Sequence, residues 1–487
     1  MSTTTGRPGD ATTGEDATLS DLPLVRSERI WGFWQYTWVN VGLAIATWAF
    51  LQGAAVAYYV GVREAIASIV VGYAVSILLV SLAPVLPCAK YGIEQFILLR
   101  SVFGTNGARI VMVAVSTIFA AAWAAVLAIM LGHGVVNLLN RVFGTSMGHA
   151  GPAVTVAAMV AIVVAWAILA RGPVSVERVS AVVAPVLIVV LVGMVVIILT
   201  RTPWSTISEL PSLGQEPDRR TNFMLAIELG IAGGFAWWPN LGNLARLSTG
   251  PRAAFWPNWL GVFLASVLAA VVGVLAALSL QSTEPTDWMI PLGGVVLGSI
   301  ALVAIGLANL TAILSQGYGS MVALRSGGGR FFKALPWPVM GLAILGPAAV
   351  LVCFPATVYD NYGRFLSWGA IVVAPLCGVQ IVDYFVLRRT RIDVRELYRP
   401  VGESVYGYWG GVNVMAFVAV VAGALTYSSL LHPIDYVPSA LFVYTTASVP
   451  SFLVAASVHY VLARWVSRPL GMGGYPVVTR EPAGRGR

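Results

Sequence analysis

The segment FMLAIELGIAGGFAWWPNLGNLAR, residues 223–246, decides how the rest of the chain is interpreted. It is long and apolar enough to cross a membrane, yet it carries a carboxylate, Glu228, and several glycines before Pro239. Glycine and proline weaken the helical hydrogen-bond ladder, and open backbone at membrane depth persists only beside protein or a water-filled cavity. A broken span with aromatic residues and a buried acid predicts a binding site. The alternative is a glycine-rich packing helix with an interfacial tryptophan pair.

The composition is that of a polytopic membrane protein. Of the 487 residues, 58% are hydrophobic and only 10% are charged, whereas soluble domains average about 25% charged residues. The three cysteines and four histidines are dispersed without metal-ligand spacing, so neither a metal site nor another cofactor is predicted. The net charge of +8 is attributed to membrane topology rather than to nucleic-acid binding.

Twelve apolar segments, called spans 1 to 12, each approach the roughly 20 residues needed to cross a bilayer. They cover residues 37–59, 65–87, 106–136, 152–170, 178–199, 222–245, 255–280, 291–323, 337–354, 364–387, 411–432 and 440–464. The chain is therefore predicted to be an all-α membrane protein with twelve transmembrane helices. Spans 3 and 8 are longer than a crossing requires, so tilt or an overhang is expected there.

The distribution of basic residues supports this count and sets the orientation. With the N-terminus inside, the cytoplasmic segments hold 23 of the 29 Lys and Arg residues, as the positive-inside rule requires. We therefore expect a multi-pass protein of the inner (plasma) membrane with both termini in the cytoplasm. Residues 1–30 lack the apolar core of a signal peptide and are expected to form a disordered tail, as are residues 466–487; residues 31–465 form the transporter domain.

Span 1 is interrupted in a similar way to span 6. Residues 40–61 read NVGLAIATWAFLQGAAVAYYVG, in which Gly42 and Gly53 bracket Trp48. Two interrupted spans, five apart, indicate a transporter built from inverted repeats. We expect a 5+5 repeat, with two peripheral helices following it. The first repeat covers about 37–199, the second about 222–387 and the extra helices about 411–464.

Three segments carry a family resemblance. They are AKYGIEQFILLRSVFGTNGAR at 89–109, APLCGVQIVDYFVLRRTRIDVRELY at 374–398 and YGYWGGVNVMAF at 406–417. The chain resembles the nucleobase:cation symporter family, which includes permeases for cytosine, purines, hydantoins and allantoin, over about 31–465. The resemblance implies a LeuT-type fold, in which a bundle of spans 1, 2, 6 and 7 packs against a scaffold of spans 3, 4, 8 and 9. Substrate would lie between spans 1, 3, 6 and 8.

The resemblance also implies a pocket for a planar ring. Trp123, a lone large ring among alanines in span 3, stands where the family places its stacking tryptophan; the alternative is a lipid-facing or packing ring. The family's amide about four residues later is Leu127 here. Phe235 or Trp237 would supply the second face, and Trp48 adds a ring from span 1. Stacking on an aromatic side chain is worth roughly 1–3 kcal/mol per base.

Polar groups in spans 6 and 8 are candidates for contacting the edge of such a ring. The break in span 6 is expected to expose the backbone amides of Gly233 and Gly234. Asn309 and Gln316 in span 8 are seven residues apart and so share a helix face. The alternative for these two amides is hydrogen bonding between helices. The W-x-P-Y-x-x-D-x-x-R pattern of the cytosine–purine branch also has Asn243 here in place of its acid.

Two routes for ion coupling are open. In sodium-coupled relatives, carbonyls of spans 1 and 8 and two adjacent hydroxyls hold the ion, and hard cations prefer such oxygen ligands. The corresponding residues are Ala44, Thr47, Ala308 and Thr311, followed by Ala312 where the second hydroxyl is expected.

The other route is a proton on Glu228, because burial raises the pKa of a carboxylate. Glu228 is a candidate for carrying the coupling proton or contacting the substrate. Its alternative role is that of a paired structural acid.

These observations predict a secondary active transporter that imports a nucleobase or related planar heterocycle by symport with H⁺ or Na⁺ through alternating access. It is expected to work as a monomer in the lipid bilayer. A second hypothesis keeps the fold but transports an amino acid or amine, which would need fewer stacking aromatics. A third, an integral-membrane enzyme, would need paired acids, a metal cluster or a nucleophile–base set, and the spans show no such pairing. The sequence contains no Walker motif, so ATP-driven transport by this chain is not predicted.

Overall fold

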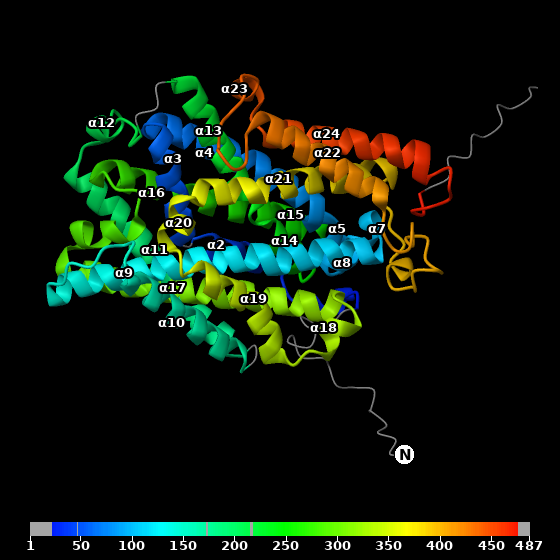
Figure 1. The fold of residues 1–487 in the computed structure, drawn as a ribbon, viewed down its shortest axis with the longest axis horizontal. Helices are drawn as coiled ribbons and strands as arrows, with labels where there is room; N and C mark the ends of the chain where they lie inside the picture. Colours follow the sequence, from blue (N-terminus) through cyan, green and yellow to red (C-terminus); the bar gives the residue numbers. More distant parts are fainter. Residues whose placement is uncertain (1–21, 46, 172–173, 215–217, 476–487) are drawn as a thin grey trace, which may run out of the picture.

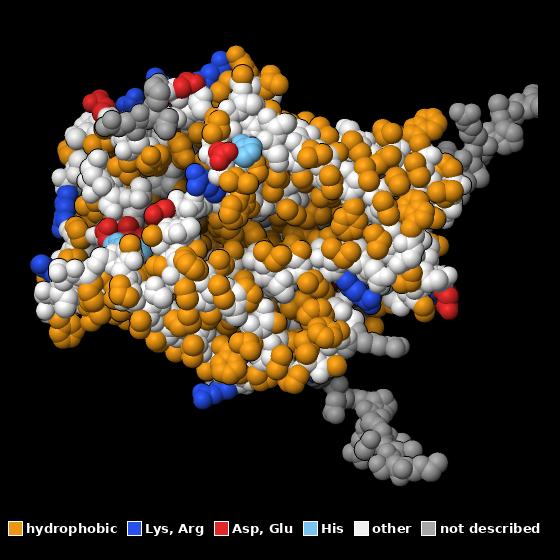
Figure 2. Space-filling view, in the orientation of Figure 1, with side chains coloured by type: hydrophobic (Ala, Val, Ile, Leu, Met, Phe, Trp, Pro, Cys, Tyr) orange, Lys and Arg blue, Asp and Glu red, His pale blue; other side chains and the backbone are white. Residues whose placement is uncertain are grey.

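The computed structural model describes residues 22–45, 47–171, 174–214 and 218–475. In this part of the chain nearly all regular structure is helical, and the only β pairing consists of isolated bridges. The long helices run close to the long axis of the molecule (Figure 1). Hydrophobic side chains cover most of the face in Figure 2, and charged groups are sparse on it. Both features are those of a membrane-spanning helix bundle.

The first five spans correspond to helices of the first repeat. These are α2 (Phe33–Ala44) and α3 (Thr47–Tyr59) in span 1; α4 (Val62–Val80), η2 (Ser81–Val85) and α5 (Leu86–Tyr91) in span 2; α8 (Thr105–Val113), η3 (Ala114–Phe119) and α9 (Ala120–Phe143) in span 3; α10 (Pro152–Leu169) in span 4; and α11 (Val174–Arg201) in span 5. The short helices of this half are η1 (Arg26–Glu28), α6 (Gln95–Leu98), α7 (Arg100–Phe103) and α12 (Trp204–Ile207).

The later spans follow the same plan. They contain α13 (Arg219–Phe235) and α14 (Trp238–Ala245) in span 6; α15 (Pro251–Pro257), η4 (Asn258–Val262) and α16 (Phe263–Leu280) in span 7; α17 (Pro285–Gly327) in span 8; α19 (Trp337–Leu351) in span 9; α21 (Tyr362–Ile381) and η5 (Val382–Leu387) in span 10; α22 (Val414–Leu430) in span 11; and α24 (Ser448–Leu462) with η7 (Ala463–Ser467) in span 12. The short helices are α18 (Arg330–Ala334), α20 (Pro355–Asp360), η6 (Arg395–Leu397) and α23 (Phe442–Thr445).

Each predicted span overlaps a helix or a group of consecutive helices. By length and composition, seven helical segments among the described residues can cross a membrane, and the bent pair α2 and α3 makes an eighth. Three further apolar helices are shorter, namely Pro185–Arg201, Trp337–Leu351 and Val414–Leu430. The all-α membrane fold is confirmed, whereas the count of twelve stays a prediction. In span 8, α17 is kinked near its start at Gly294, whose φ is 67°.

The helices pack in the two groups that the resemblance implies. Helix α3 packs against α16 and α13 against α4, which joins spans 1 and 7 and spans 2 and 6. In a five-span repeat, span 1 corresponds to span 6 and span 2 to span 7, so the repeat relates the first of these pairs to the second. The second group is built on α9, which packs against α17, α10 and α19 and so joins spans 3, 8, 4 and 9. Helices α21, α22 and α24 pack together as a third layer, which lies along one side of the molecule in Figure 1.

Close helix contacts explain why glycine is frequent in the bundle. Where α4 crosses α13, a Cβ atom on Gly72 would lie 2.7 Å from the Cα atom of Gly230, so a side chain would force the helices apart. Small residues at crossings let helices pack closely in membranes, where there is no hydrophobic driving force between them. Prolines at the first turn of α10, α15, α17 and α19 fix where these helices begin.

Candidate functional site

The interruption of span 1 lies beside span 8. Helix α2 ends at Ala44, α3 begins at Thr47, and the two are bent by 58°. The Thr47 hydroxyl donates a hydrogen bond to the side-chain oxygen of Asn309, and both residues are buried. Ile45 packs against Ala308. The structure thus brings together the carbonyl-bearing break of span 1 and the part of span 8 in which a cation site is predicted.

Thr311, the other residue predicted to bind a cation, faces its own helix. Its hydroxyl donates to the carbonyl of Ala308 at 2.8 Å. The hydroxyl oxygen can still accept or coordinate, because donation uses only its hydrogen. The assignment of these residues to a cation stays a prediction.

The interruption of span 6 lies two residues beyond the glycines that suggested it. Gly233 and Gly234 are inside α13, and the turn that separates α13 from α14 consists of Ala236 and Trp237. A Cβ atom on Gly234 would lie 1.9 Å from the Ser76 hydroxyl oxygen, and one on Gly233 would lie 2.9 Å from the Gln52 side chain. The prediction of exposed amides is therefore wrong, because these glycines allow α13 to pack tightly against spans 1 and 2.

Three tryptophans from three spans meet at the interruptions. The Trp48 ring lies 6.1 Å from the Trp123 ring and 5.3 Å from the Trp237 ring, edge to face in both cases. Trp123 is only 5% exposed, so it is not lipid-facing. Trp48 contacts both other rings and so connects Trp123 of span 3 with Trp237 of span 6.

The structure also separates the two candidates for the second aromatic face. Trp237 contacts the cluster through Trp48, whereas Phe235 is buried at the last turn of α13 and has no ring contact with these tryptophans in the described structure. Side-chain nitrogens of Trp123, Trp237 and Asn309 are buried without a hydrogen-bond partner among the described residues. Buried donors without partners are rare, so they are available to a ligand at this position.

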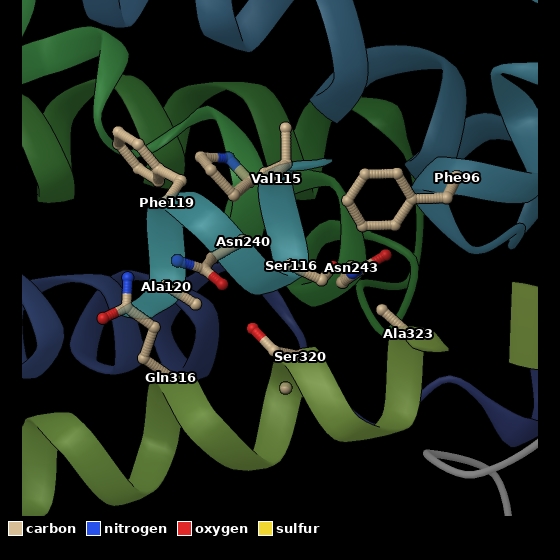
Figure 3. A pocket seen from close by; sticks show the side chains of 12 residues that line it. Phe96, Val115, Ser116, Phe119, Ala120, Asn240, Asn243, Gln316, Ser320 and Ala323 are labelled. Atoms are coloured by element: carbon tan, nitrogen blue, oxygen red, sulfur yellow. The ribbon is translucent and has the colours of Figure 1, made fainter. Parts of the chain in front are cut away.

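A narrow crevice continues from the aromatic cluster between spans 3, 6 and 8. Phe119 forms one end of its lining, and its ring is 6.4 Å from that of Trp123. Five polar side chains line the crevice (Figure 3): Ser116, Asn240, Asn243, Gln316 and Ser320. It has room for about one water molecule, so it is closed to a heterocycle in this conformation. Asn309 and Gln316 both lie on the inner face of α17. Asn309 contacts span 1, whereas Gln316 lines the crevice.

Glu228 points to a different part of the molecule. Its carboxylate accepts hydrogen bonds from the backbone nitrogens of Ala447 and Ser448, at 3.0 and 3.1 Å, and from the Ser448 hydroxyl. Ser448 is the first residue of α24, so the carboxylate caps that helix, where the helix dipole favours a negative charge. This geometry favours the alternative of a paired structural acid. A role in coupling or substrate contact stays a prediction.

Comparison with known proteins identifies the family. The family described as permeases for cytosine/purines, uracil, thiamine and allantoin matches residues 23–446. The chain belongs to this permease family. It is similar to the hydantoin permease of Microbacterium maritypicum (34% identity over 125 residues, 26% of this chain and 22% of that protein) and to the purine-uracil permease NCS1 of Arabidopsis thaliana (25% over 222 residues, 44% and 36%). It is also similar to the allantoin permease of Bacillus subtilis (34% over 100 residues, 20% and 19%).

These alignments span between 19 and 36% of the relatives' lengths, so what those permeases transport is not transferred as a finding. Solved structures agree on the fold of this permease. The closed conformation of Mhp1, a nucleobase-cation-symport-1 family transporter with bromovinylhydantoin bound, has a TM-score of 0.72 at 17% identity and covers 92% of this chain and 96% of its own. Inward-facing Mhp1 has a TM-score of 0.76 at 17% identity, with 94% of each chain covered. The resemblance and the LeuT-type fold are confirmed, and the chain is a multi-pass membrane permease rather than an enzyme.

Sequence analysis missed several residues that the permease brings to the site. Gln52 in α3 donates to the Leu229 carbonyl in α13 at 2.7 Å and accepts from the Tyr362 hydroxyl in α21 at 3.2 Å. Tyr362 and Phe365 also contact the Trp123 ring, at 6.1 and 5.2 Å. Span 10 therefore forms one wall of the aromatic cluster. A polar residue inside an apolar run was the available signal for Gln52, whereas nothing local in the sequence connects Tyr362 to Trp123.

Proposed function

We propose that the chain is a secondary transporter that imports a nucleobase or a related planar heterocycle together with H⁺ or Na⁺ by alternating access. One observation carries this proposal: Trp48, Trp123 and Trp237 come from three spans and meet where two spans are interrupted. Aromatic rings bind planar bases by stacking, which is worth roughly 1–3 kcal/mol per base. The relatives named for hydantoin, purine-uracil and allantoin support this class of substrate.

The proposed site has three parts. Stacking surfaces come from Trp123 and Trp237, with Trp48 as the ring between them. Polar contacts come from Asn309 and Gln316 on the inner face of span 8, and the crevice beyond Gln316 is the route toward the cytoplasm. The proposed ion site lies at the break of span 1, with oxygen ligands from the following residues: Ala44, Thr47, Ala308 and Thr311.

We propose an inner (plasma) membrane location, with both termini cytoplasmic, because 23 of the 29 Lys and Arg residues then face the cytoplasm. The transporter domain covers about 31–465, and the complete site within one chain supports function as a monomer.

Ligand-dependent stabilisation of the purified protein tests the proposed substrate class. A ligand that binds the native state raises the apparent melting temperature by mass action. We expect stabilisation by nucleobases or hydantoins, and a larger shift in the presence of the coupling ion. Trp123→Ala should weaken binding at least tenfold, whereas Trp465→Ala, whose side chain is 70% exposed, should leave it unchanged. Stabilisation by amino acids or amines, with no response to planar heterocycles, would overturn the assignment.

A further inference from the structure

The short helix α6 joins span 6 to the loop between spans 2 and 3. Gln95, its first residue, is fully buried. Its side-chain nitrogen donates to the Trp238 carbonyl at 2.8 Å, and its side-chain oxygen accepts from the Gly242 nitrogen at 3.0 Å. Its backbone nitrogen donates to the Asn243 side-chain oxygen at 2.8 Å. One residue thus makes three hydrogen bonds to α14, the second half of span 6.

The fit between Gln95 and α14 depends on the absence of a side chain at Gly242. A Cβ atom there would lie 2.4 Å from the side-chain oxygen of Gln95. The preceding residue, Glu94, caps α6 by accepting from the Ile97 nitrogen at 2.8 Å, which fixes the start of the helix. The contact between α6 and α14 is therefore specific in its geometry, not only a result of burial.

Helix α6 also covers one end of the crevice. Phe96 lines the crevice, and its ring is 6.2 Å from the Trp238 ring, edge to face. Figure 3 shows Phe96 and Ala323 at the same end of the crevice, opposite Phe119 and Gln316. Helix α6 packs against α17 of the scaffold as well. Helix α6 therefore bridges the bundle and the scaffold at the end of the crevice farthest from the aromatic cluster of Trp48, Trp123 and Trp237.

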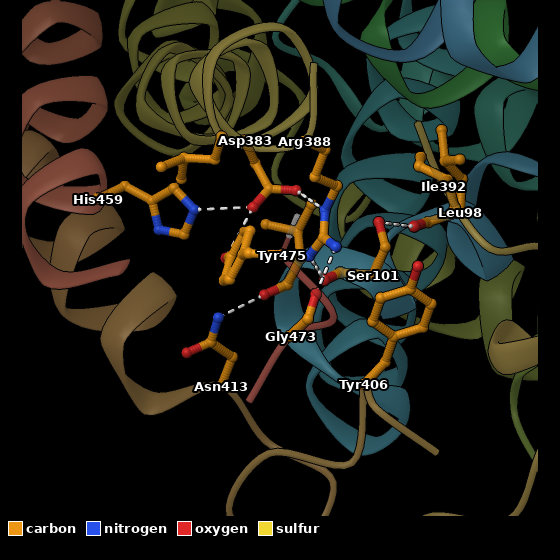
Figure 4. Close-up of polar contacts among 12 residues, drawn as sticks. Leu98, Ser101, Asp383, Arg388, Ile392, Tyr406, Asn413, His459, Gly473 and Tyr475 are labelled. Carbon is orange, nitrogen blue, oxygen red and sulfur yellow. Dashed lines mark hydrogen bonds and ion pairs between the residues drawn. The ribbon is translucent and has the colours of Figure 1, made fainter. Parts of the chain in front are cut away.

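The remainder of the same loop is held by residues that follow span 10 and, through them, by residues near the C-terminus. The Ser101 carbonyl accepts from the buried Arg388 guanidinium at 2.6 Å and from the Tyr408 hydroxyl at 2.7 Å. Arg388 also pairs with Asp383, which accepts from Tyr475 at 2.9 Å (Figure 4). The loop is thus fixed at its far end, and the bonds of Gln95 attach its near end to span 6.

We propose that Gln95 is a positioning residue for transport, which attaches the inner latch (α6, residues 95–98) to α14 and keeps the crevice closed toward the cytoplasm. Release of its three bonds would free Phe96 from the end of the crevice and free α14, which follows directly on Trp237 of the aromatic cluster. The inference rests on the proposed alternating-access function, because a latch at the inner end has a role only if that end opens.

Cysteine labelling tests the inner latch without any substrate. In a Cys353→Ser background, Ala323→Cys places a thiol at the end of the crevice next to Phe96, and the two remaining native cysteines are buried. We expect Gln95→Ala to raise the labelling rate of this thiol by about tenfold, because loss of buried hydrogen bonds shifts the population toward the open form. In uptake assays the same variant should change KM and Vmax by different factors.

Asn137→Ala is the matched control. Asn137 makes three comparable hydrogen bonds, to Thr286, Asp287 and His149, far from α14. It should lower the melting temperature without changing the labelling rate. If Gln95→Ala folds and labels at the parental rate, the latch is refuted.

A second pair of variants decides the question if Gln95→Ala does not fold. Asn243→Asp keeps the acceptor for the Gln95 backbone nitrogen, and Asn243→Leu removes it. We expect faster labelling in the Leu variant and restoration of the parental rate in the Asp variant. Equal rates would overturn the proposal. Because labelling needs no ligand, failure to find a transported heterocycle would leave this result standing and would count only against the proposed substrate.

Discussion

Spans 1 and 6 are both interrupted and both carry a buried polar side chain, but these side chains have different partners. In span 1, Thr47 is the first residue after the break, and its hydroxyl bonds to Asn309 of span 8. In span 6, Glu228 lies well before the turn at residues 236–237, and its carboxylate caps α24 in span 12. A buried polar residue in an interrupted span therefore has two different roles. In span 1 it lies at a site between the bundle and the scaffold, and in span 6 it caps a helix.

The difference shows that burial alone does not identify a functional polar residue in a membrane protein. Glu228 and Asn309 are both fully buried. The Glu228 carboxylate accepts from three protein donors, whereas the amide nitrogen of Asn309 has no partner in the part of the chain that the structure describes. A polar group with free hydrogen-bonding capacity next to a break in a helix is available to a ligand, whereas the donors of Glu228 already give it a structural role.

Replacement of Glu228 is expected to have the largest effect on stability. Glu228→Ala leaves the buried nitrogens of Ala447 and Ser448 without their charged acceptor and should lower the free energy of unfolding by about 3 kcal/mol. Glu228→Gln keeps a neutral acceptor and should cost about 1 kcal/mol. Denaturant titration of the purified protein measures both values. Glu64→Gln is the control, because its partner Arg219 has an 86% exposed side chain, and exposed pairs contribute about 0–1 kcal/mol.

The same Glu228→Gln variant distinguishes capping from coupling. A capping role predicts uptake with unchanged dependence on pH, because the carboxylate then takes no part in proton transfer. Uptake that loses its pH dependence while the protein remains folded would show that Glu228 carries the coupling proton, and the contrast between the two spans would disappear.

The parts of the fold that depend on local composition were predictable from the sequence. Runs of apolar residues mark the spans, and the interruptions of spans 1 and 6 follow from residues that do not favour a continuous apolar helix. The position of the second break was not predictable, because Gly233 and Gly234 fit a close contact with Gln52 and Ser76, which is a tertiary property. The aromatic cluster was predicted from the tryptophans Trp48, Trp123 and Trp237 in spans 1, 3 and 6.

Long-range partners explain the remaining differences. Glu228 and Ser448 are 220 residues apart, and Gln95 and Asn243 are 148 residues apart. A single sequence gives no information on which distant helix end approaches a given side chain. The acid in span 6 was therefore recognised as unusual, but its partner was not identified. Gln95 lies in a segment that carried the family resemblance, but nothing in that segment indicated its contact with span 6.

A smaller effect, confined to ion coupling, is expected at the break of span 1. Thr47→Val removes the hydroxyl that bonds to Asn309 and should raise the ion concentration needed for half-maximal uptake by about tenfold, since one buried hydrogen bond is worth about 1 kcal/mol or slightly more. Thr47→Ser retains the hydroxyl and should stay near the parental value. Uptake measured against sodium concentration and against pH identifies the ion. Equal behaviour of the Val and Ser variants would mean that the hydroxyl has no part in coupling.

The smallest expected effect concerns another buried acid, Glu284, whose partner is a histidine. Glu284 precedes α17, and its carboxylate lies 2.8 Å from the His133 ring nitrogen and accepts from Thr286. Burial opposes ionisation of Glu284, but the hydrogen bond and charge of His133 outweigh it and lower the pKa of the carboxyl below its ordinary value. A lowered pKa stabilises the fold above the ordinary glutamate pKa of about 4.3, and this contribution is lost as the pH falls through the lower folded value.

Glu284→Gln should therefore lower the free energy of unfolding by about 1 kcal/mol at pH 7, and its difference from the parent should shrink below about pH 4. Denaturant titrations at a series of pH values measure this difference, with Glu64→Gln again as the control. Glu228→Gln provides the comparison, because its donors are two backbone amides and a hydroxyl, which do not titrate in this range. A Glu284→Gln difference that stays constant from pH 7 to pH 3 would mean that the carboxyl is not held ionised by His133, and that its role is hydrogen bonding alone.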